Sequence, residues 1–226
     1  GYNPLEVYKM IFEGAFIGIY NIMNTLQKAT PLIFTSLAVL VASRTGIFNM
    51  GVEGQLVLGA VAAAWAGFTF KGLPFAIHLP LSLGISMIVG ALYAFIPAIL
   101  KLRYEVNEIL SAIMLNTVAT LLASYLVNYP LRESLVSART PKVLDSAILP
   151  RIVSYSQANV GLFIAIFCVV LFWYIFQKTT FGYRTRTVGD ARLFAKYVGI
   201  DPMKTSFLAM LISGALAGLG GGVEIL

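Results

Sequence analysis

The sequence predicts an all-α integral membrane protein, a polytopic helical bundle with about six spans. Hydrophobic residues make up 58% of the 226 residues, the mean hydropathy is +0.84, and only 12% of the residues are charged. An average soluble domain is about 25% charged. A spanning helix needs about 20 mostly apolar residues, and six stretches of the chain meet that need. We therefore treat residues 1–226 as a single transmembrane domain.

The predicted spans follow the apolar stretches in order along the chain. We expect them at residues 28–43, 47–70, 75–100, 106–128, 158–177 and 205–225. The stretch before them, "LEVYKMIFEGAFIGIYNIM", has charges too closely spaced for a span, so we expect an amphipathic helix lying along the interface. The sequence begins with Gly1 and ends inside an apolar run. We therefore expect a fragment of a longer chain that carries further spans on both sides.

The connections between spans predict the orientation, because positively charged loops stay on the cytoplasmic side. The short connections "SRTG" and "KLRYE" carry three cations, whereas "KGLP" carries one. We place the first two in the cytoplasm, which puts Gly1 outside. The net charge of +6 then reflects loop charges that orient the helices and does not indicate a nucleic-acid partner.

A polar cluster interrupts the second span, where Asn49, Glu53 and Gln55 occur among apolar and small residues. A charge near the centre of a span costs about 2.5 to 3.5 kcal/mol, so it persists where it faces protein or a wet cavity. The two glycines that flank Glu53 weaken the helix, and we expect a discontinuous helix near residues 49–55 that lines a cavity. We interpret the cluster as part of a path for a polar, uncharged solute. A purely structural polar cluster is the alternative.

The fourth span carries a second polar group, Asn107 and Glu108 at its start and Asn116 deeper in. Asn107 is expected to cap the helix. The positive N-terminus of that helix favours the Glu108 carboxylate. Asn116 lies at midspan and needs a polar partner there. All three are candidates for the substrate path, and capping is the structural alternative for the first two.

The connection between the fifth and sixth spans contains "DARLFAKYVG", which predicts a short cytoplasmic helix near residues 190–199. Asp190 is expected to cap its start, Gly199 to close its end, and Pro202 to prevent continuation. Ten residues span about 15 Å, which is too short to cross a bilayer. Apolar side chains gather on one face: Leu193, Phe194, Tyr197 and Val198. Such a face favours docking into a partner's groove or packing against the membrane ends of this chain.

Other motifs narrow the possible functions. Gly214, Gly218 and Gly222 recur at four-residue spacing, which is typical of closely packed membrane helices, although the glycines could instead flex the last span. The sequence contains no P-loop for ATP. His78 has no Cys or His partner nearby in the sequence, so we expect no metal site. The single cysteine, Cys168, excludes a disulfide within the chain.

Four stretches, "GIFNMGVEGQLVLGA", "VNEILSAIMLN", "FGYRTRTVGDARLFAKYVGI" and "LISGALAGLGGGVEIL", together resemble the membrane permease subunit of bacterial ABC importers. The similarity is to the branched-chain amino acid and simple-sugar permease family. It covers essentially the whole chain in order. The stretch "NMGVEGQ", where the ribose-type branch reads more like "DLSVG", favours the nucleoside (guanosine-type) branch.

The resemblance implies a non-enzymatic permease subunit that moves nucleosides inward across a bacterial plasma membrane, in which it is a multi-pass protein. Simple-sugar import is the alternative function within the family. Outside the family, one alternative is a proton-coupled secondary transporter with Glu53 as the coupling carboxylate. The other is a membrane channel or scaffold. The implied partners are a second permease subunit, identical or different, a cytoplasmic ABC ATPase, an extracellular solute-binding lipoprotein and membrane lipid. No cofactor is expected in this chain, because ATP and Mg²⁺ would bind the ATPase.

The resemblance also implies that "DARLFAKYVGI" is the coupling helix, which corresponds to the E-A-A-x-x-x-G loop that inserts into the ATPase. Leu193 and Phe194 stand where the family pattern has Glu and the first Ala, and Ala195 and Gly199 match it. The residues expected to couple this chain to the ATPase are Asp190, Leu193, Phe194, Ala195, Tyr197 and Gly199.

Overall fold

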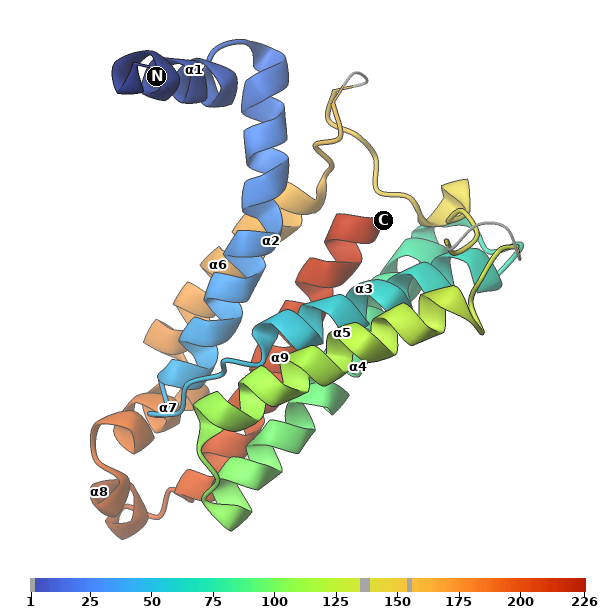
Figure 1. Ribbon diagram of the computed structural model, residues 1–226. Coiled ribbons are helices and arrows are strands. Elements are labelled where there is room, and N and C mark those ends of the chain that lie inside the picture. Colours follow the sequence, from blue (N-terminus) through green and yellow to red (C-terminus); the bar gives the residue numbers. More distant parts are fainter. Residues whose placement is uncertain (1–2, 135–138, 154–155) are drawn as a thin grey trace.

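The computed structural model describes residues 3–134, 139–153 and 156–226 (Figure 1). These ranges contain helices and loops and no strand. Within these ranges, six helices are long and apolar enough to cross a membrane. They are α2 (Ile19–Ser43), α3 (Val52–Thr69), α4 (Phe75–Tyr104), α5 (Glu108–Asn128), α6 (Gly161–Lys178) and α9 (Pro202–Ile225). The prediction of an all-α polytopic bundle with about six spans is confirmed.

The four remaining elements are short. They are α1 (Pro4–Phe16), the 3₁₀ turn η1 (Asp145–Ala147), α7 (Thr180–Asp190) and α8 (Arg192–Tyr197). The α7–α8 pair lies at the end of the bundle where α2 and α4 finish, and the α1 and η1 elements lie at the opposite end (Figure 1). The basic connections that we placed in the cytoplasm are thus gathered at one end of the bundle. Gly1 lies outside the described residues.

The prediction for the first span was too short at its beginning. Helix α2 begins at Ile19 and runs through Pro31 without a break, and α1 ends at Phe16. Gly18, with a φ of +90°, makes the turn between the two helices, a conformation that glycine adopts without steric cost. No residue of α1 is buried. Helix α1 lies crosswise to α2, beside the beginning of α2 (Figure 1). Its place along the interface stays a prediction.

Helix α9 forms the centre of the bundle and packs on α2, α3 and α4. Gly214 and Gly218 lie against small residues of α4, and a Cβ on Gly59 of α3 would lie 2.6 Å from the Cα of Gly218. The Ser86 hydroxyl of α4 donates a hydrogen bond to the Gly218 carbonyl oxygen. Small residues allow such close backbone approach in lipid. The close-packing interpretation of the glycine repeat is therefore confirmed.

His78 ties together the opposite end of the bundle. The ring is fully buried in α4, with Nδ1 2.7 Å from the Ser146 hydroxyl of η1 and Nε2 3.2 Å from the carbonyl oxygen of Ala66 in α3. Both ring nitrogens therefore have partners in this chain. The histidine joins two spans and the loop that covers them.

We predict that Gly218→Val destabilises the protein. A Cβ at residue 218 would overlap the Ser86 carbonyl oxygen and come within 3.0 Å of the Gly90 Cα, and overpacking typically costs 1–3 kcal/mol. Thermal unfolding of the detergent-purified protein measures the effect. Gly84→Val is the matched control, because a Cβ on Gly84 would meet no atom within 4 Å. Equal loss of stability in both variants would contradict the packing role of Gly218.

Candidate functional site

The residues just before α3 form a non-helical segment between two spans. Residues 44–46 turn, residues 47–51 are irregular, and the helix is continuous from Val52 onward. Ile47 and Asn49 are each 1% exposed. The break predicted near residues 49–55 is thus confined to the part before Val52, and residues 52–55 are helical. Irregular backbone is tolerated at membrane depth where it is buried in protein.

Asn116 of α5 holds the beginning of α3. Its side-chain oxygen accepts a hydrogen bond from the Gly54 backbone N–H at 3.0 Å, and its Nδ2 donates to the Met50 carbonyl oxygen at 3.0 Å. The first residues of a helix leave backbone N–H groups without helical partners, and the N-cap residue of α3, Gly51, has no side chain to supply one. Asn116 therefore supplies the missing cap from a neighbouring helix.

Glu53 lies in the first turn of α3 and is exposed on the surface of the chain. Within the described residues, its carboxylate makes no hydrogen bond or ion pair. It lies on a pocket of about 300 Å³ between α3 and α5, whose lining is Glu53, Ile113, Asn116, Thr117 and Thr120. Asn116 is eight residues into α5, about 12 Å from the start of that helix. The carboxylate thus lies well inside the span of α5.

Asn49 and Gln55 do not share that pocket. The Asn49 amide donates to the Gln55 side-chain oxygen at 2.9 Å and to the Ser213 hydroxyl at 2.8 Å, while the Gln55 amide donates back to Asn49 at 3.2 Å. The Ser213 hydroxyl then donates to the Ala38 carbonyl oxygen at 2.6 Å. This buried network joins α2, α3 and α9. Asn49 and Gln55 hold the beginning of α3 against α9 through this network. Their place in a solute path stays a prediction.

Asn107 and Glu108 lie at the beginning of α5. The Asn107 side chain accepts hydrogen bonds from the backbone N–H groups of Ile109 at 2.9 Å and Leu110 at 3.2 Å. Glu108 forms an ion pair with Lys101 of α4, with 2.6 Å between Oε2 and Nζ. The capping alternative for Asn107 is confirmed. Both residues lie apart from the Glu53 pocket, and their path role stays a prediction.

The predicted coupling helix is shorter than expected and has a different cap. Asp190 is the last residue of α7, and α8 follows after Ala191, which offers no side-chain cap. The expectation that Asp190 caps this helix is wrong, because "TFGYRTRTVGD" forms a helix of its own that uses Asp190 as its end. The prediction that Gly199 ends this helix is confirmed, since Gly199 has a φ of +79°. Pro202 starts α9, with Asp201 as its cap.

The apolar side chains of α8 face outward. Leu193 is 75% exposed, Phe194 55% and Tyr197 90%, whereas Ala195 is fully buried. A groove of about 690 Å³ lies beside them, between α8 and the adjoining ends of α4 and α9, and Lys101, Glu105, Arg192, Leu193, Lys196 and Asp201 are among the residues that line it. The alternative in which this face packs on the chain's own membrane ends is not what the structure shows. The face is available to a partner.

Sequence reasoning missed several residues of the pocket and its support. Thr117 and Thr120 line the pocket, and Ser213 completes the buried network. The spacing of Asn116 and Thr120, four residues apart on one helix face, was a signal that could have found Thr120. Nothing local to Ser213 indicated contact with a residue 164 positions away in the sequence.

The fold and site define a class of protein, a polytopic helical membrane protein with a polar pocket among its spans and an exposed apolar helix at one end. The chain belongs to the family described as "Branched-chain amino acid transport system / permease component", which matches residues 21–226. The predicted family is confirmed, and so is a multi-pass location in the bacterial plasma membrane.

Individual relatives carry more specific names. The chain is 39% identical to the guanosine ABC transporter permease protein NupP of Bacillus subtilis, over 99% of this chain and 65% of that protein. It is 33% identical to the nucleoside ABC transporter permease protein NupB of Lactococcus lactis, over 98% and 63%. It is 31% identical to the glucose ABC transporter permease protein TsgB13 of Haloferax volcanii, over 99% and 61%. The chain thus spans less than two thirds of the length of these relatives. No solved structure matches it.

We predict that Asn49→Ala lowers stability and that Glu53→Ala does not. Removing Asn49 leaves the Gln55 amide and the Gly51 N–H without their buried partner, which costs about 1–3 kcal/mol. Glu53 is exposed, and such surface substitutions usually change stability by less than about 0.5 kcal/mol. Thermal unfolding of the two purified variants beside the parent protein makes the comparison. Equal destabilisation would show that Glu53 also belongs to the structural network.

Proposed function

We propose that the chain is a pore-forming permease subunit of an ATP-driven importer that carries nucleosides inward. The observation that carries this proposal is the Glu53 pocket, in which a carboxylate, an amide and two threonine hydroxyls lie inside the span of α5 on an exposed face. Relatives named as guanosine and nucleoside permeases support the choice of solute. The pocket is the inner part of the solute path.

The chemistry of the pocket suits a polar, uncharged solute. A nucleoside that leaves water loses hydrogen bonds, and polar side chains in the path replace them at about 1 kcal/mol net each. The Glu53 carboxylate accepts hydrogen bonds, so it suits the hydroxyl groups of a sugar. Few such contacts keep binding weak enough for release. No covalent step takes place in this chain.

The partners follow from the exposed surfaces. Helix α5 is the least buried of the six spans, and its polar face at membrane depth is costly against lipid. A second permease subunit, identical or different, covers that face and closes the path. An extracellular solute-binding lipoprotein delivers the nucleoside. The exposed apolar face of α8 docks on a cytoplasmic ABC ATPase, which binds ATP and Mg²⁺, so that this chain needs no cofactor.

Simple-sugar import is the second candidate function. The relative named as a glucose permease is 31% identical over 99% of this chain, which is close to the identity of the nucleoside relative NupB. The two candidates differ in whether the path must also accommodate a planar base. Uptake competition separates them.

We predict that the assembled transporter takes up guanosine and that unlabelled nucleosides compete better than ribose or glucose. Vesicles containing the full-length permease with its partner subunits provide the assay. Glu53→Ala should raise the KM several-fold, because each lost hydrogen bond is worth about 1 kcal/mol. Uptake should stop on ATP depletion and persist with a protonophore. Uptake that follows the proton gradient instead would identify a secondary transporter, and competition by sugars alone would identify a sugar importer.

We predict that Tyr197→Asp in α8 reduces ATPase binding at least tenfold and abolishes uptake. Tyr197 is 90% exposed beside Leu193, and a charge at the centre of an apolar docking face typically costs 2 kcal/mol or more, since such interfaces concentrate their energy in a few aromatic residues. Co-purification of the ATPase with the permease measures binding. Tyr197→Phe is the matched control and should retain both activities. Normal ATPase binding by Tyr197→Asp would exclude α8 as the docking helix.

A further inference from the structure

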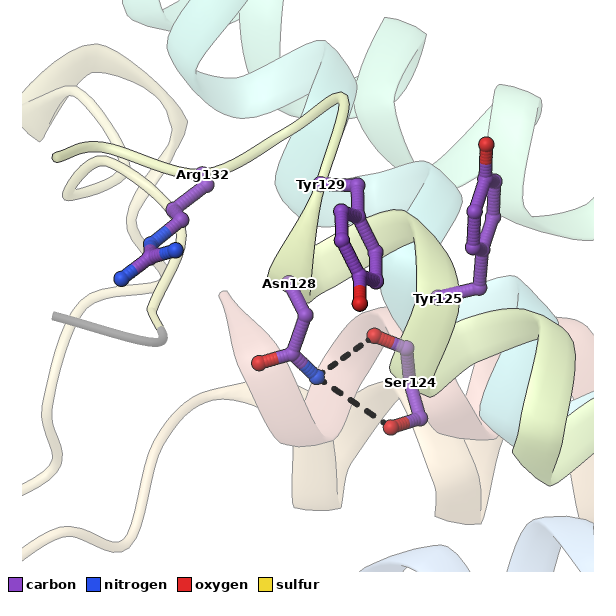
Figure 2. Close-up of a pocket in the computed structure, with 5 residues that line it drawn as sticks. All are labelled: Ser124, Tyr125, Asn128, Tyr129 and Arg132. Carbon is purple, nitrogen blue, oxygen red and sulfur yellow. Dashed lines mark hydrogen bonds between the residues drawn. The ribbon is translucent and has the colours of Figure 1, made fainter. Parts of the chain in front are cut away.

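Polar residues continue along α5 beyond the Glu53 pocket. Asn116, Thr120, Ser124 and Asn128 are spaced four residues apart, and residues at this spacing are neighbours on one face of a helix. A second pocket of about 370 Å³ lies at the far end of this row (Figure 2), and its lining is Ser124, Tyr125, Asn128, Tyr129 and Arg132. Helix α5 runs outward from its cytoplasmic start, so this second pocket lies at the extracellular end of the span.

The two pockets adjoin along the helix. Thr120 belongs to the inner pocket and Ser124 to the outer one, and four residues of helix advance about 6 Å. A solute that moves along the polar face of α5 therefore passes from one directly to the other. The inner pocket carries a carboxylate and hydroxyls, and the outer one carries an amide and two aromatic rings.

Asn128 and Ser124 present a matched hydrogen-bonding edge. The Asn128 Nδ2 donates to the Ser124 carbonyl oxygen at 2.7 Å and to the Ser124 hydroxyl oxygen at 3.2 Å. Within the described residues, the Asn128 side-chain oxygen has no donor and the Ser124 hydroxyl proton has no acceptor. Figure 2 shows the Asn128 oxygen directed away from Ser124. One acceptor and one donor are thus left for a ligand.

The two tyrosines supply aromatic faces beside that edge. The ring centroids of Tyr125 and Tyr129 are 5.2 Å apart with an interplanar angle of 31°, and the two residues are 57% and 72% exposed. In Figure 2 the Tyr129 ring lies beside the Asn128 side chain, and the Tyr125 ring lies on the far side of Tyr129. Aromatic rings stack on a planar base, and an adjacent donor and acceptor read the polar edge of such a ring.

We propose that Ser124, Tyr125, Asn128 and Tyr129 form an outer subsite that binds the heteroaromatic base of the solute. The proposal rests on the proposed function and names the part of the nucleoside that each pocket takes. The base stacks on Tyr129 and bonds to Asn128 and Ser124 as the solute enters from outside. The sugar hydroxyls point along α5 toward Thr120 and Glu53. A simple sugar lacks the planar ring and makes little use of the outer subsite.

Membrane anchoring is the competing explanation for the two tyrosines, because tyrosine is enriched at membrane interfaces. An anchoring role requires only that the ring lies at the membrane interface. Loss of an anchoring ring would therefore affect transport of every solute equally. Tyr20 provides the matched control, since it is 55% exposed near the start of α2, at the same end of the bundle. Replacing Tyr20 by leucine changes an interfacial ring outside the proposed subsite.

We predict that Tyr129→Leu raises the KM for guanosine uptake about tenfold with little change in kcat, because a stacking contact is lost. Tyr129→Phe keeps the ring and should resemble the parent, and Asn128→Ala should raise the KM several-fold. The assay uses the full-length permease assembled with its partner subunits in vesicles, with the amount of inserted protein measured for each variant. Inhibition by guanosine and by ribose is compared, and only guanosine inhibition should weaken in Tyr129→Leu.

Four results would overturn the proposal. An unchanged KM in both Tyr129→Leu and Asn128→Ala would remove the outer subsite while leaving nucleoside import in place. An equal effect of Tyr20→Leu and Tyr129→Leu, or an equal loss of guanosine and ribose inhibition, would assign the tyrosines to anchoring. A parent transporter that takes up sugars and no nucleoside would overturn the proposed function itself, and the base subsite with it.

Discussion

The two hydrogen bonds from Asn116 to the segment around Gly54 are the interaction on which the site depends. They hold the beginning of α3 against α5, at a helix start whose N-cap residue offers no side chain. Because α3 begins there, Glu53 stands in a first helical turn, where a positive helix N-terminus favours a carboxylate. Asn116 thus helps to fix the helix start and, with it, the position of the carboxylate. The proposed path residue and its support both belong to the contact between α3 and α5.

Helix α7 is packed directly against the segment that leads into this site. Helix α7 ends on the turn at residues 44–46, and a Cβ on Gly189 would overlap the Arg44 carbonyl oxygen. The Arg44 guanidinium lies 5.6 Å from the centre of the Phe176 ring in α6. The same turn continues through Ile47 to Asn49 and the buried network. At Gly189 the backbone of α7 therefore lies directly against the backbone of the turn that precedes α3.

The sequence was sufficient for the spans and the class of protein, because apolar length and loop charge are local properties. It also placed Glu53 and Asn116 among the candidates, since a polar residue inside an apolar run is visible without any knowledge of packing. It could not separate Glu53 from Gln55, which is two residues away. The direction of the Glu53 and Gln55 side chains depends on contacts with α5 and α9. Ser213 of α9 bonds to Asn49, which in turn bonds to Gln55, so these two amides belong to the buried network. Asp190 was misread because the residues before it form a helix of their own that ends at Asp190.

Helix α5 has a polar row along a face that this chain leaves uncovered, and that combination constrains the assembly. Each threonine or serine can bond to the carbonyl oxygen of the preceding turn, as Thr120 does to Asn116 at 3.0 Å, and a lipid-facing helix tolerates such residues. The Glu53 carboxylate and the Asn128 side-chain oxygen differ from these hydroxyl groups. They have no hydrogen-bond partner among the described residues, and lipid offers them none. Glu53 near one end of the row and Asn128 near the other therefore require water, a solute or a second subunit along the whole face. In the proposed assembly, the solute path and the subunit interface therefore run along the same side of α5.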